Sequence, residues 1–239
     1  MADGIRLRVL TYNVHSRRDD VAALGSVVRD LAPDVAIIQE GPRRLRWRQQ
    51  SAAFARLTGL LVAGGGLPAL GNLVLTNMRV SVREATCVRF PLTPGRHMRG
   101  AVFVRCSIGR VPFVVVGSHL SLDAQERTSQ ATLLKKHLAE LDAPVLFGGD
   151  LNENSGGSAW RTIADGLCDA AVATDRAHLG TFPGGDPRER IDAVFVDQGC
   201  AITDYQVIQT DETRAASDHL PIVVDLALPS TGQRRGSAA

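Results

Sequence analysis

The chain has 239 residues, of which 44% are hydrophobic and 22% charged, a composition typical of a soluble globular protein with one large or two small domains. Its net charge of +2 is too close to zero to indicate, by itself, a protein that binds polyanions. No apolar stretch approaches the ~18 residues that a membrane-spanning helix needs.

The cysteines and the N-terminus indicate a cytoplasmic protein. Cys87, Cys106, Cys168 and Cys200 lie far apart and form no CxxC pair, which disfavours both a zinc site and a redox motif. We therefore expect free thiols. The first residues lead directly into a strand pattern, so no signal peptide is expected.

The cationic side chains are nearly all arginine, because lysine occurs only at positions 135 and 136. This bias is typical of a GC-rich bacterial genome. It is also what a surface suited to binding phosphate would require, since the planar guanidinium matches phosphate oxygens.

In chain order, the hydrophobic pattern of the first part predicts alternating strands and helices. Residues 5–13 alternate between apolar and polar, which predicts a strand, and residues 19–33 have the acidic start and terminal proline of a helix. The next predicted elements are a strand at 34–40, a basic helix at 43–60, and strands at 71–77 and 81–90.

The second part begins with residues 100–120, which predict two strands joined by a hairpin at Gly109 and Arg110. The longest helical pattern covers 123–142. Further strands are expected at 143–150, 190–197, 200–210 and 220–228. Because neither a repeat nor a long linker is visible, we expect one α/β domain over 1–228, with mixed sheets inside and helices outside. Residues 229–239 are small and polar and predict a disordered tail.

Six of the apolar strands end on polar, ionisable clusters, the positions where α/β folds build their sites. One such cluster means little, since a polar residue at a strand end usually marks the edge of solvent. Together they supply many oxygen ligands and two histidines, which favours magnesium or manganese over zinc. The side chains are those of Asn13, Glu40, His119, Asp150, Asn152, Asp192, Asp218 and His219.

The order of these motifs resembles the endonuclease/exonuclease/phosphatase family. The motifs are TYNVH at 11–15, QE at 39–40, GNLVLT at 71–76, SHL at 118–120, GDLN at 149–152, TFP at 181–183, RIDAVFV at 190–196 and SDHLPIV at 217–223. GDLN and SDH are weak signals alone, but the ordered series spans nearly the whole chain. The resemblance implies a four-layer α/β sandwich, in which two packed mixed sheets are flanked by helices, and a metal-dependent phosphoesterase.

The resemblance also implies how the site would work. Glu40 would be the main carboxylate ligand of Mg²⁺ (or Mn²⁺), with Asn13 and Asp218 as direct or water-mediated ligands. Asp150 would orient or deprotonate the attacking water, and Asn152 would donate a hydrogen bond to a phosphoryl oxygen. The two glycines before Asp150 would let the backbone come close.

Among the histidines, His219 would contact the phosphate or protonate the leaving group, oriented by Asp192. His119 would act as general acid or phosphate donor. Arg99 would either clamp the phosphate or merely cap the sheet, and the residues leave both interpretations open. The other histidines, at 15, 97, 137 and 178, are interpreted as structural.

Further residues are implied as supports of the site. Arg127 and Gln130, at the start of the long helix, would brace it from behind, and Asn72 would belong to the same supporting group. Thr181 matches a threonine of the family whose role the sequence does not define.

Residues 43–48, RRLRWR, allow two interpretations. Arginines around Trp47 could follow a nucleic-acid backbone while the indole stacks on a base, from a position directly after Glu40. Alternatively, the segment belongs to an amphipathic helix with a solvated basic face and Trp47 packed inward.

The resemblance favours the function of a nuclease-like phosphodiesterase, acting as a monomer on a phosphodiester such as DNA or RNA. SHLS stands where abasic-site enzymes of the family usually have a tyrosine motif, which disfavours abasic-site repair. The alternatives are a phosphatase or phosphodiesterase acting on a small or lipid-linked phosphate and, less favoured, a non-catalytic binding module on the same fold.

Overall fold

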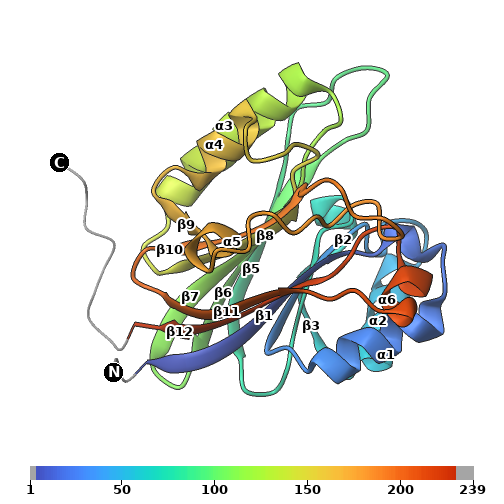
Figure 1. Cartoon of the computed structure of the whole chain (residues 1–239), viewed down its shortest axis with the longest axis horizontal. Helices are drawn as coiled ribbons and strands as arrows, with labels where there is room; N and C mark the ends of the chain where they lie inside the picture. The colour runs from blue at the N-terminus through green and yellow to red at the C-terminus, as the bar shows by residue number, and fades with distance from the viewer. Residues whose placement is uncertain (1–3, 230–239) are drawn as a thin grey trace.

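The structure of the protein is a computed structural model that describes residues 4–229. Two six-stranded sheets pack face to face, and helices cover their outer faces (Figure 1). This arrangement confirms the predicted four-layer α/β sandwich. The predicted disordered tail lies outside the described residues, apart from Pro229.

The first sheet contains the N-terminal strand and the C-terminal strand side by side. Its strands are β1 (Ile5–Asn13), β2 (Val35–Gln39), β3 (Leu61–Gly65), β4 (Leu73–Thr76), β11 (Ala201–Val207) and β12 (Ile222–Leu228). Their order across the sheet is β11-β12-β1-β2-β4-β3. Because β1 and β2 are parallel and the other neighbours antiparallel, the sheet is mixed, as predicted.

The second sheet is built mainly from the middle of the chain. Its strands are β5 (Ser81–Arg89), β6 (Gly100–Ile108), β7 (Val111–His119), β8 (Val145–Asp150), β9 (Leu167–Asp169) and β10 (Asp192–Asp197). Their order is β5-β6-β7-β8-β10-β9. Only β7 and β8 are parallel among these described strands, so this sheet is also mixed.

The helices are α1 (Val21–Leu31), α2 (Trp47–Thr58), α3 (Ala124–Ala139), α4 (Ser158–Ala164), α5 (Ala170–Ala173) and α6 (Asp211–Ala216), with 3-10 turns η1 (His15–Arg17) and η2 (Leu67–Ala69). All α-helices except α5, whose Ala170 and Ala171 pack in the core between the two sheets, form the outer layers. Helices α3 and α4 cover the second sheet, whereas α1, α2 and α6 lie against the first (Figure 1).

Helix α1 shows how the sequence specifies these layers. Asp20 accepts hydrogen bonds from the backbone N–H groups of Ala22 and Ala23 and so caps the first turn. Leu24, Val27 and Val28 are buried and share one face of the helix, as their spacing of three and four residues requires. This apolar face packs on the first sheet.

Glycines allow the two sheets to approach closely behind the site. A Cβ atom on Gly148 would lie 2.8 Å from Cδ1 of Ile37, and one on Gly117 would lie 2.8 Å from Cγ2 of the same residue. A Cβ on Gly149 would lie 2.4 Å from the carbonyl oxygen of Ser118 in the neighbouring strand. The glycines before Asp150 therefore do bring backbone close, and what they approach is the facing sheet and the adjacent strand.

The predicted elements are mostly confirmed, with local differences. Residues 43–46 are not helical, because α2 begins only at Trp47, after Arg46 in a left-handed conformation with φ of 59°. Strand β3 was not predicted, since its sequence LVAGG lacks clear alternation. Strand β9 and helices α5 and α6, of three to six residues, are too short for their periodicity to be recognised.

Two polar clusters precede their strands, which corrects the prediction that all six follow one. Strand β10 begins at Asp192, and residues 217–219 come before β12. Both strands run antiparallel to a neighbour whose C-terminal end carries part of the site, β8 and β1 respectively. Their N-terminal ends therefore reach the same edge of the sandwich.

The four cysteines are free thiols, as predicted, with Cys106 and Cys200 buried and the other two half-buried. Burial raises the pKa of the Cys106 thiol to about 12, so this side chain behaves as a small apolar core residue. Within residues 4–229, no helix has the length and apolar character needed to cross a membrane.

Candidate active site

Strand register places the predicted residues at one end of both sheets. In the second sheet, Gly100 pairs with His119, His119 with Asp150, and Asp150 with Asp192. In the first sheet, Asn13 pairs with Gln39, which directly precedes Glu40. Residues more than 200 positions apart in the chain are thereby brought together.

Asp150 lies at the centre of this arrangement and is 1% exposed. Its Oδ2 accepts a hydrogen bond from Nδ2 of Asn13 at 2.8 Å, and its Oδ1 accepts one from the backbone N–H of Asn152 at 2.9 Å. Nε2 of His119 lies 3.3 Å from Oδ2. The carboxylate is therefore oriented from both sheets and from its own loop.

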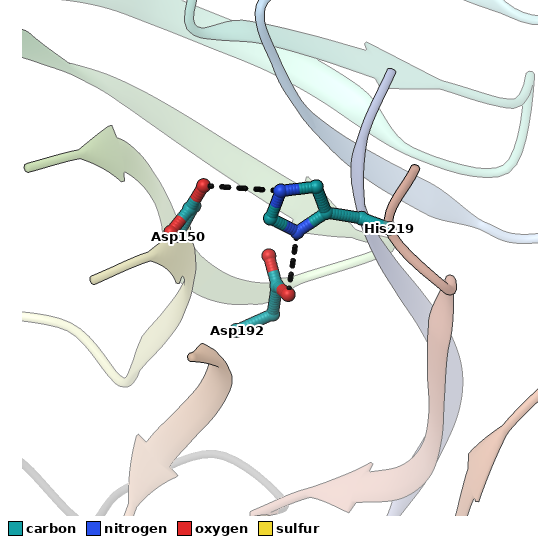
Figure 2. Close-up of side chains that lie close together, drawn as sticks. All are labelled: Asp150, Asp192 and His219. Atoms are coloured by element: carbon teal, nitrogen blue, oxygen red, sulfur yellow. Dashed lines mark hydrogen bonds and ion pairs between the residues drawn. The ribbon is translucent and has the colours of Figure 1, made fainter. Parts of the chain in front are cut away.

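His219 lies between two carboxylates (Figure 2). Its Nδ1 is 2.9 Å from Oδ2 of Asp192, and its Nε2 is 3.7 Å from Oδ2 of Asp150. Burial alone lowers the pKa of His219, but the charge and hydrogen bond of Asp192, with the charges of Asp150 and Asp218, raise it to about 10. The imidazolium form therefore predominates at neutral pH.

Buried hydroxyl groups hold this histidine–aspartate pair in place. Oγ1 of Thr181, a fully buried residue, accepts from the backbone N–H groups of Ile191 and Asp192 at 3.3 Å. Oγ of Ser217 donates to the carbonyl oxygen of Asn13 at 2.7 Å and accepts from the N–H of His219 at 3.2 Å. Thr181 thus supports the backbone before Asp192, a role that could not be defined from the sequence.

His119 lies in a different electrostatic environment from His219. Burial lowers its pKa to about 3; the charge of Asp150 opposes this shift, and the charge of Arg99 adds to it. Its Nε2 lies 3.0 Å from Nδ2 of Asn152, which also donates to the carbonyl oxygen of Leu120 at 3.0 Å. A neutral His119 that accepts from Asn152 satisfies both groups.

Glu40 and Asp218 approach the site from the first sheet. Oε2 of Glu40 accepts from the hydroxyl of Ser16 at 2.6 Å, and Oδ2 of Asp218 lies 3.7 Å from Nε2 of His15. Because the N–H of His15 also donates to Oδ1 of Asn13 at 3.1 Å, His15 and Ser16 together contact all three predicted metal ligands.

Left-handed backbone is concentrated around this end of the sandwich. Glu40 has φ of 56° and Asn152 has φ of 49°, and each of residues 15–17 also has a positive φ. Such conformations cost roughly 1–2 kcal/mol for residues other than glycine, asparagine and aspartate. Their concentration at one place is typical of a functional site.

Arg99, immediately before β6, has an unusual environment for a cation. It is 8% exposed, its Nε has no hydrogen-bond partner among the described residues, and burial lowers its pKa against the opposing charges of Asp150 and Glu40. Nδ2 of Asn72 donates to the carbonyl oxygen of Gly100 at 3.0 Å and so fixes the adjacent backbone. The arginine lies inside the site, which disfavours the sheet-cap interpretation.

The residues implied as braces contact the loops of the second sheet. Nε of Arg127 lies 3.0 Å from Oε2 of Glu153, and its Nη1 donates to the carbonyl oxygens of Ser121 and Leu122 at 2.9 Å. Oε1 of Gln130 accepts from the N–H of Ser121 at 2.9 Å. Helix α3 thus holds the loops that follow His119 and Asn152.

Two sets of side chains could hold a metal ion. Ligand atoms of Asp150, Asp192 and His219 lie within 4.8 Å of one another, and all three residues are buried. The sequence instead indicated Glu40, Asn13 and Asp218 as ligands. Oδ1 of Asp218 and Oδ1 of Asp192 are buried and have no hydrogen-bond partner within residues 4–229, so each set contains an acceptor that a cation would satisfy.

The structure brings all nine predicted site residues to the same end of the sandwich. Several contacting residues were not assigned to the site from the sequence, although each lies within or directly beside a quoted motif. They are His15, Ser16, Glu153 and Ser217. Adjacency to a motif was therefore the available signal, and His15, interpreted as structural, lies beside Asp218.

The chain combines a four-layer α/β sandwich with carboxylate, amide and imidazole groups gathered at one end, and this combination places it in the class of phosphoesterases. The sequence profile of the Endonuclease/Exonuclease/phosphatase family matches residues 10–219. The chain belongs to this family and is a phosphoric ester hydrolase. A search of curated protein sequences gives no match.

Solved structures share the fold. A family member from Bacteroides thetaiotaomicron is 19% identical with a TM-score of 0.78, over 95% of this chain and 100% of its own. A mannosyl-6-phosphatase from the same species is 17% identical with a TM-score of 0.78, over 93% and 100%. D. rerio TDP2, in complex with a single-strand DNA product, is 21% identical with a TM-score of 0.72, over 92% and 98%.

Proposed function

We propose that the protein is a magnesium-dependent, nuclease-like phosphodiesterase in which Asp150 activates the attacking water. The observation that carries the proposal is the meeting of two buried groups: the carboxylate of Asp150 and the imidazolium of His219, whose Nε2 lies 3.7 Å from Oδ2 of Asp150. Hydrolysis of a phosphoester needs a base for water and donors for the phosphoryl oxygens. These side chains supply both functions within one buried cluster.

Asp150 is suited to hold the water because its position is fixed while its surroundings are polar. Asn13 and the N–H of Asn152 each occupy one carboxylate oxygen with a single hydrogen bond. A carboxylate oxygen has two lone pairs, so each retains an acceptor site for a water proton. The water would then be oriented towards a phosphorus atom bound by the neighbouring donors.

The donor on the other side is His219, because both N–H groups of the Asn152 amide already donate, to Nε2 of His119 and to the carbonyl oxygen of Leu120. His219 is held as an imidazolium by Asp192, so that its Nε2–H can donate to a phosphoryl oxygen or protonate the leaving oxygen. For His119 the geometry favours a positioning role, since a neutral imidazole that accepts from Asn152 has no second proton to give. Arg99 adds a buried positive charge for the phosphate.

Glu40, Asp218 and Asn13 would hold the magnesium ion. Asp192 is less suited, because one of its oxygens already accepts from His219, and an imidazolium cannot coordinate a cation. Glu40 and Asp218 leave oxygen acceptors for a hard cation, and the orphaned Oδ1 of Asp218 supports this choice. The bound ion would neutralise charge on the phosphate.

The class of substrate rests on relatives with the same fold. TDP2 binds a single-strand DNA product, whereas the bacterial relative is a mannosyl-6-phosphatase. A phosphodiester substrate is favoured here, with a small phosphomonoester as the second candidate. The test compares bis-p-nitrophenyl phosphate, p-nitrophenyl phosphate, an oligonucleotide and mannose 6-phosphate, each with Mg²⁺ and with EDTA.

Variants test the assignment of the base. Asp150→Asn should lower turnover of the preferred substrate by about 10³-fold or more, because the amide cannot take a proton from water. Asp30→Asn, on the exposed surface of α1, is the matched control and should retain wild-type turnover. Turnover of Asp150→Asn within tenfold of the control would refute the assignment, and absence of hydrolysis with every substrate would refute the proposed function.

A further inference from the structure

The near-neutral net charge of the chain conceals a strong segregation of charge. Residues 41–122 contain twelve of the 27 basic residues, all of them arginine, but only one of the 25 acidic residues, Glu84. This segment therefore has a net charge of +11, whereas the remainder of the chain has −9. A segment of this sign and size attracts polyanions.

The fold places this basic segment on one flank of the sandwich. It forms β3 and β4 at one edge of the first sheet and β5, β6 and β7 at one edge of the second, and β3 contacts both β5 and β6. The opposite edges are formed by β9 and β11, with α5 between them. The candidate active site lies at one end of the sandwich. Arg99 belongs both to this site and to the basic segment 41–122, so the basic flank adjoins the site.

Arginines on this flank differ in whether they have acidic partners. Far from the site, Arg79 pairs with Asp34 at 2.7 Å, and Arg105 with Asp142 at 2.6 Å. Other arginines of the flank, at 56, 83, 89 and 110, form no ion pair within residues 4–229. The same is true of the four that lie nearest the site, in the loop after Glu40 and the first turn of α2, and their position sets them apart. They are Arg43, Arg44, Arg46 and Arg48, which we call the arginine track.

Hydrogen bonds connect the track to the site. Asn72 donates to the carbonyl oxygen of Gly100, next to the buried Arg99. The adjacent carbonyl oxygens of Leu70 and Gly71 accept from Nη1 of Arg43 at 3.2 Å and from the N–H of Gly41 at 2.8 Å. The positive groups thus continue from a buried arginine, through the half-buried Arg43, to the exposed Arg44, Arg46 and Arg48.

Trp47 supports this surface and is not free to stack on a base. The guanidinium of Arg48 lies 4.6 Å from the centroid of its ring. The ring also packs so tightly on Gly66 that a Cβ there would lie 2.6 Å from its Cε3. Because both Arg48 and the backbone at Gly66 lie against the indole, the segment offers cationic groups rather than a stacking platform.

We propose that the arginine track binds the phosphate backbone of a polynucleotide strand that leaves the active site over the 41–48 loop. A single phosphomonoester would need only the buried Arg99, whereas unpaired arginines that extend outwards suit a substrate with repeated phosphates. Arginine is also better suited than lysine to bidentate contact with phosphate. The inference rests on the proposed function and specifies the substrate class of that site.

The test compares two double variants with equal change in charge. Arg44→Gln/Arg48→Gln alters the track, whereas Arg56→Gln/Arg110→Gln alters exposed arginines on the same flank, at the end of α2 and in the β6–β7 hairpin. Binding of a fluorescent single-stranded oligonucleotide is measured by anisotropy in EDTA at several salt concentrations. The track variant should bind about tenfold more weakly than the control, with a salt slope lower by about 1.4 for two lost phosphate contacts.

The outcomes distinguish the two proposals. Equal oligonucleotide binding by both double variants would contradict the proposal that the arginine track binds the phosphate backbone. The same holds if the track variant loses sedimentation with phosphatidylserine vesicles but keeps oligonucleotide binding, since the surface would then bind membranes. If the wild type hydrolyses bis-p-nitrophenyl phosphate but binds no oligonucleotide, the track fails while the proposed function stands. If track-dependent binding occurs without hydrolysis of any phosphoester, the proposed function fails instead.

Discussion

Nδ2 of Asn13 donates a hydrogen bond of 2.8 Å to Oδ2 of Asp150, and this bond joins the ends of β1 and β8 across the two sheets. Oδ1 of the same asparagine accepts from the N–H of His15 and so fixes the start of η1. Asn13 therefore couples the orientation of the proposed base to the loop that contacts Glu40 and Asp218.

Replacement of Asn13 by alanine should reduce both stability and activity. A buried carboxylate loses a hydrogen-bond donor, which costs about 1–3 kcal/mol, and turnover should fall about 10²-fold because Asp150 is no longer held. Asn77→Ala is the matched control, since Nδ2 of Asn77 donates to Asp34 at the same distance of 2.8 Å. Urea unfolding should show comparable losses of stability for both variants, but only Asn13→Ala should lose turnover. Equal turnover of the two variants would show that Asn13 does not support catalysis.

The two site histidines should give stability opposite dependences on pH. His119 has its pKa lowered from 6.5 to about 3, so the unfolded chain binds more protons there, and its contribution to stability is lost as pH falls below 6.5. His219 has its pKa raised from 6.5 to about 10, so its contribution is present below 6.5 and is lost as pH rises towards 10. Together they favour a stability maximum near pH 6.5.

Single variants separate these two contributions. The free energy of unfolding is measured by urea denaturation between pH 4 and pH 9.5, in EDTA, so that no bound cation contributes. His119→Asn should flatten the acid side of the profile, and His219→Asn the alkaline side, whereas the exposed His178→Asn serves as control. If His219→Asn leaves the alkaline side as steep as in the wild type, the imidazolium assigned to His219 is wrong.

How far the sequence predicts this site can be judged from particular residues. Asp150 and Asn152 were identifiable because an apolar strand ends on GDLN, and the strand pattern locates its own end. The hydrogen bond from Asn13 to Asp150 was not, since it depends on which strands face each other across the sandwich. The opposite pKa shifts of His119 and His219 likewise depend on Asp192, which contacts one histidine by hydrogen bond and not the other.

The fold itself was more accessible than its exact boundaries. Periodicity predicted nearly all long strands and α1, α2 and α3, because an apolar face must be buried wherever it occurs. The start of α2 was misplaced because Arg46 adopts a left-handed conformation that no local pattern announces. The direction in which Asp192 meets its strand was misjudged because antiparallel pairing with β8 is a tertiary property.

Substitution of the two sets of candidate ligands should decide where the metal binds. Glu40→Gln should weaken Mg²⁺ or Mn²⁺ binding at least about tenfold, because it removes a charged ligand from an otherwise intact site. Asp192→Asn should lower turnover and leave metal affinity within about threefold, since Asp192 acts on His219. Titration calorimetry measures both affinities, with Asp30→Asn as control; a larger loss for Asp192→Asn would favour the set of Asp150, Asp192 and His219.

Close packing of the sheets behind Asp150 should be sensitive to a single methyl group. A Cβ on Gly148 would lie 2.8 Å from Cδ1 of Ile37 and 3.1 Å from Cβ of Thr11, both in the facing sheet. Gly148→Ala should therefore cost about 1–3 kcal/mol of stability and, by moving β8 away from Asn13, also reduce turnover. Ile37→Val removes the Cδ1 atom, so the double variant Gly148→Ala/Ile37→Val should recover part of the losses in stability and turnover. If the stability costs of the two substitutions simply add, the clash with Cδ1 of Ile37 is not the cause of the loss. Gly156→Ala is the control, because no atom lies within 4 Å of the added Cβ, and it should leave stability and turnover unchanged.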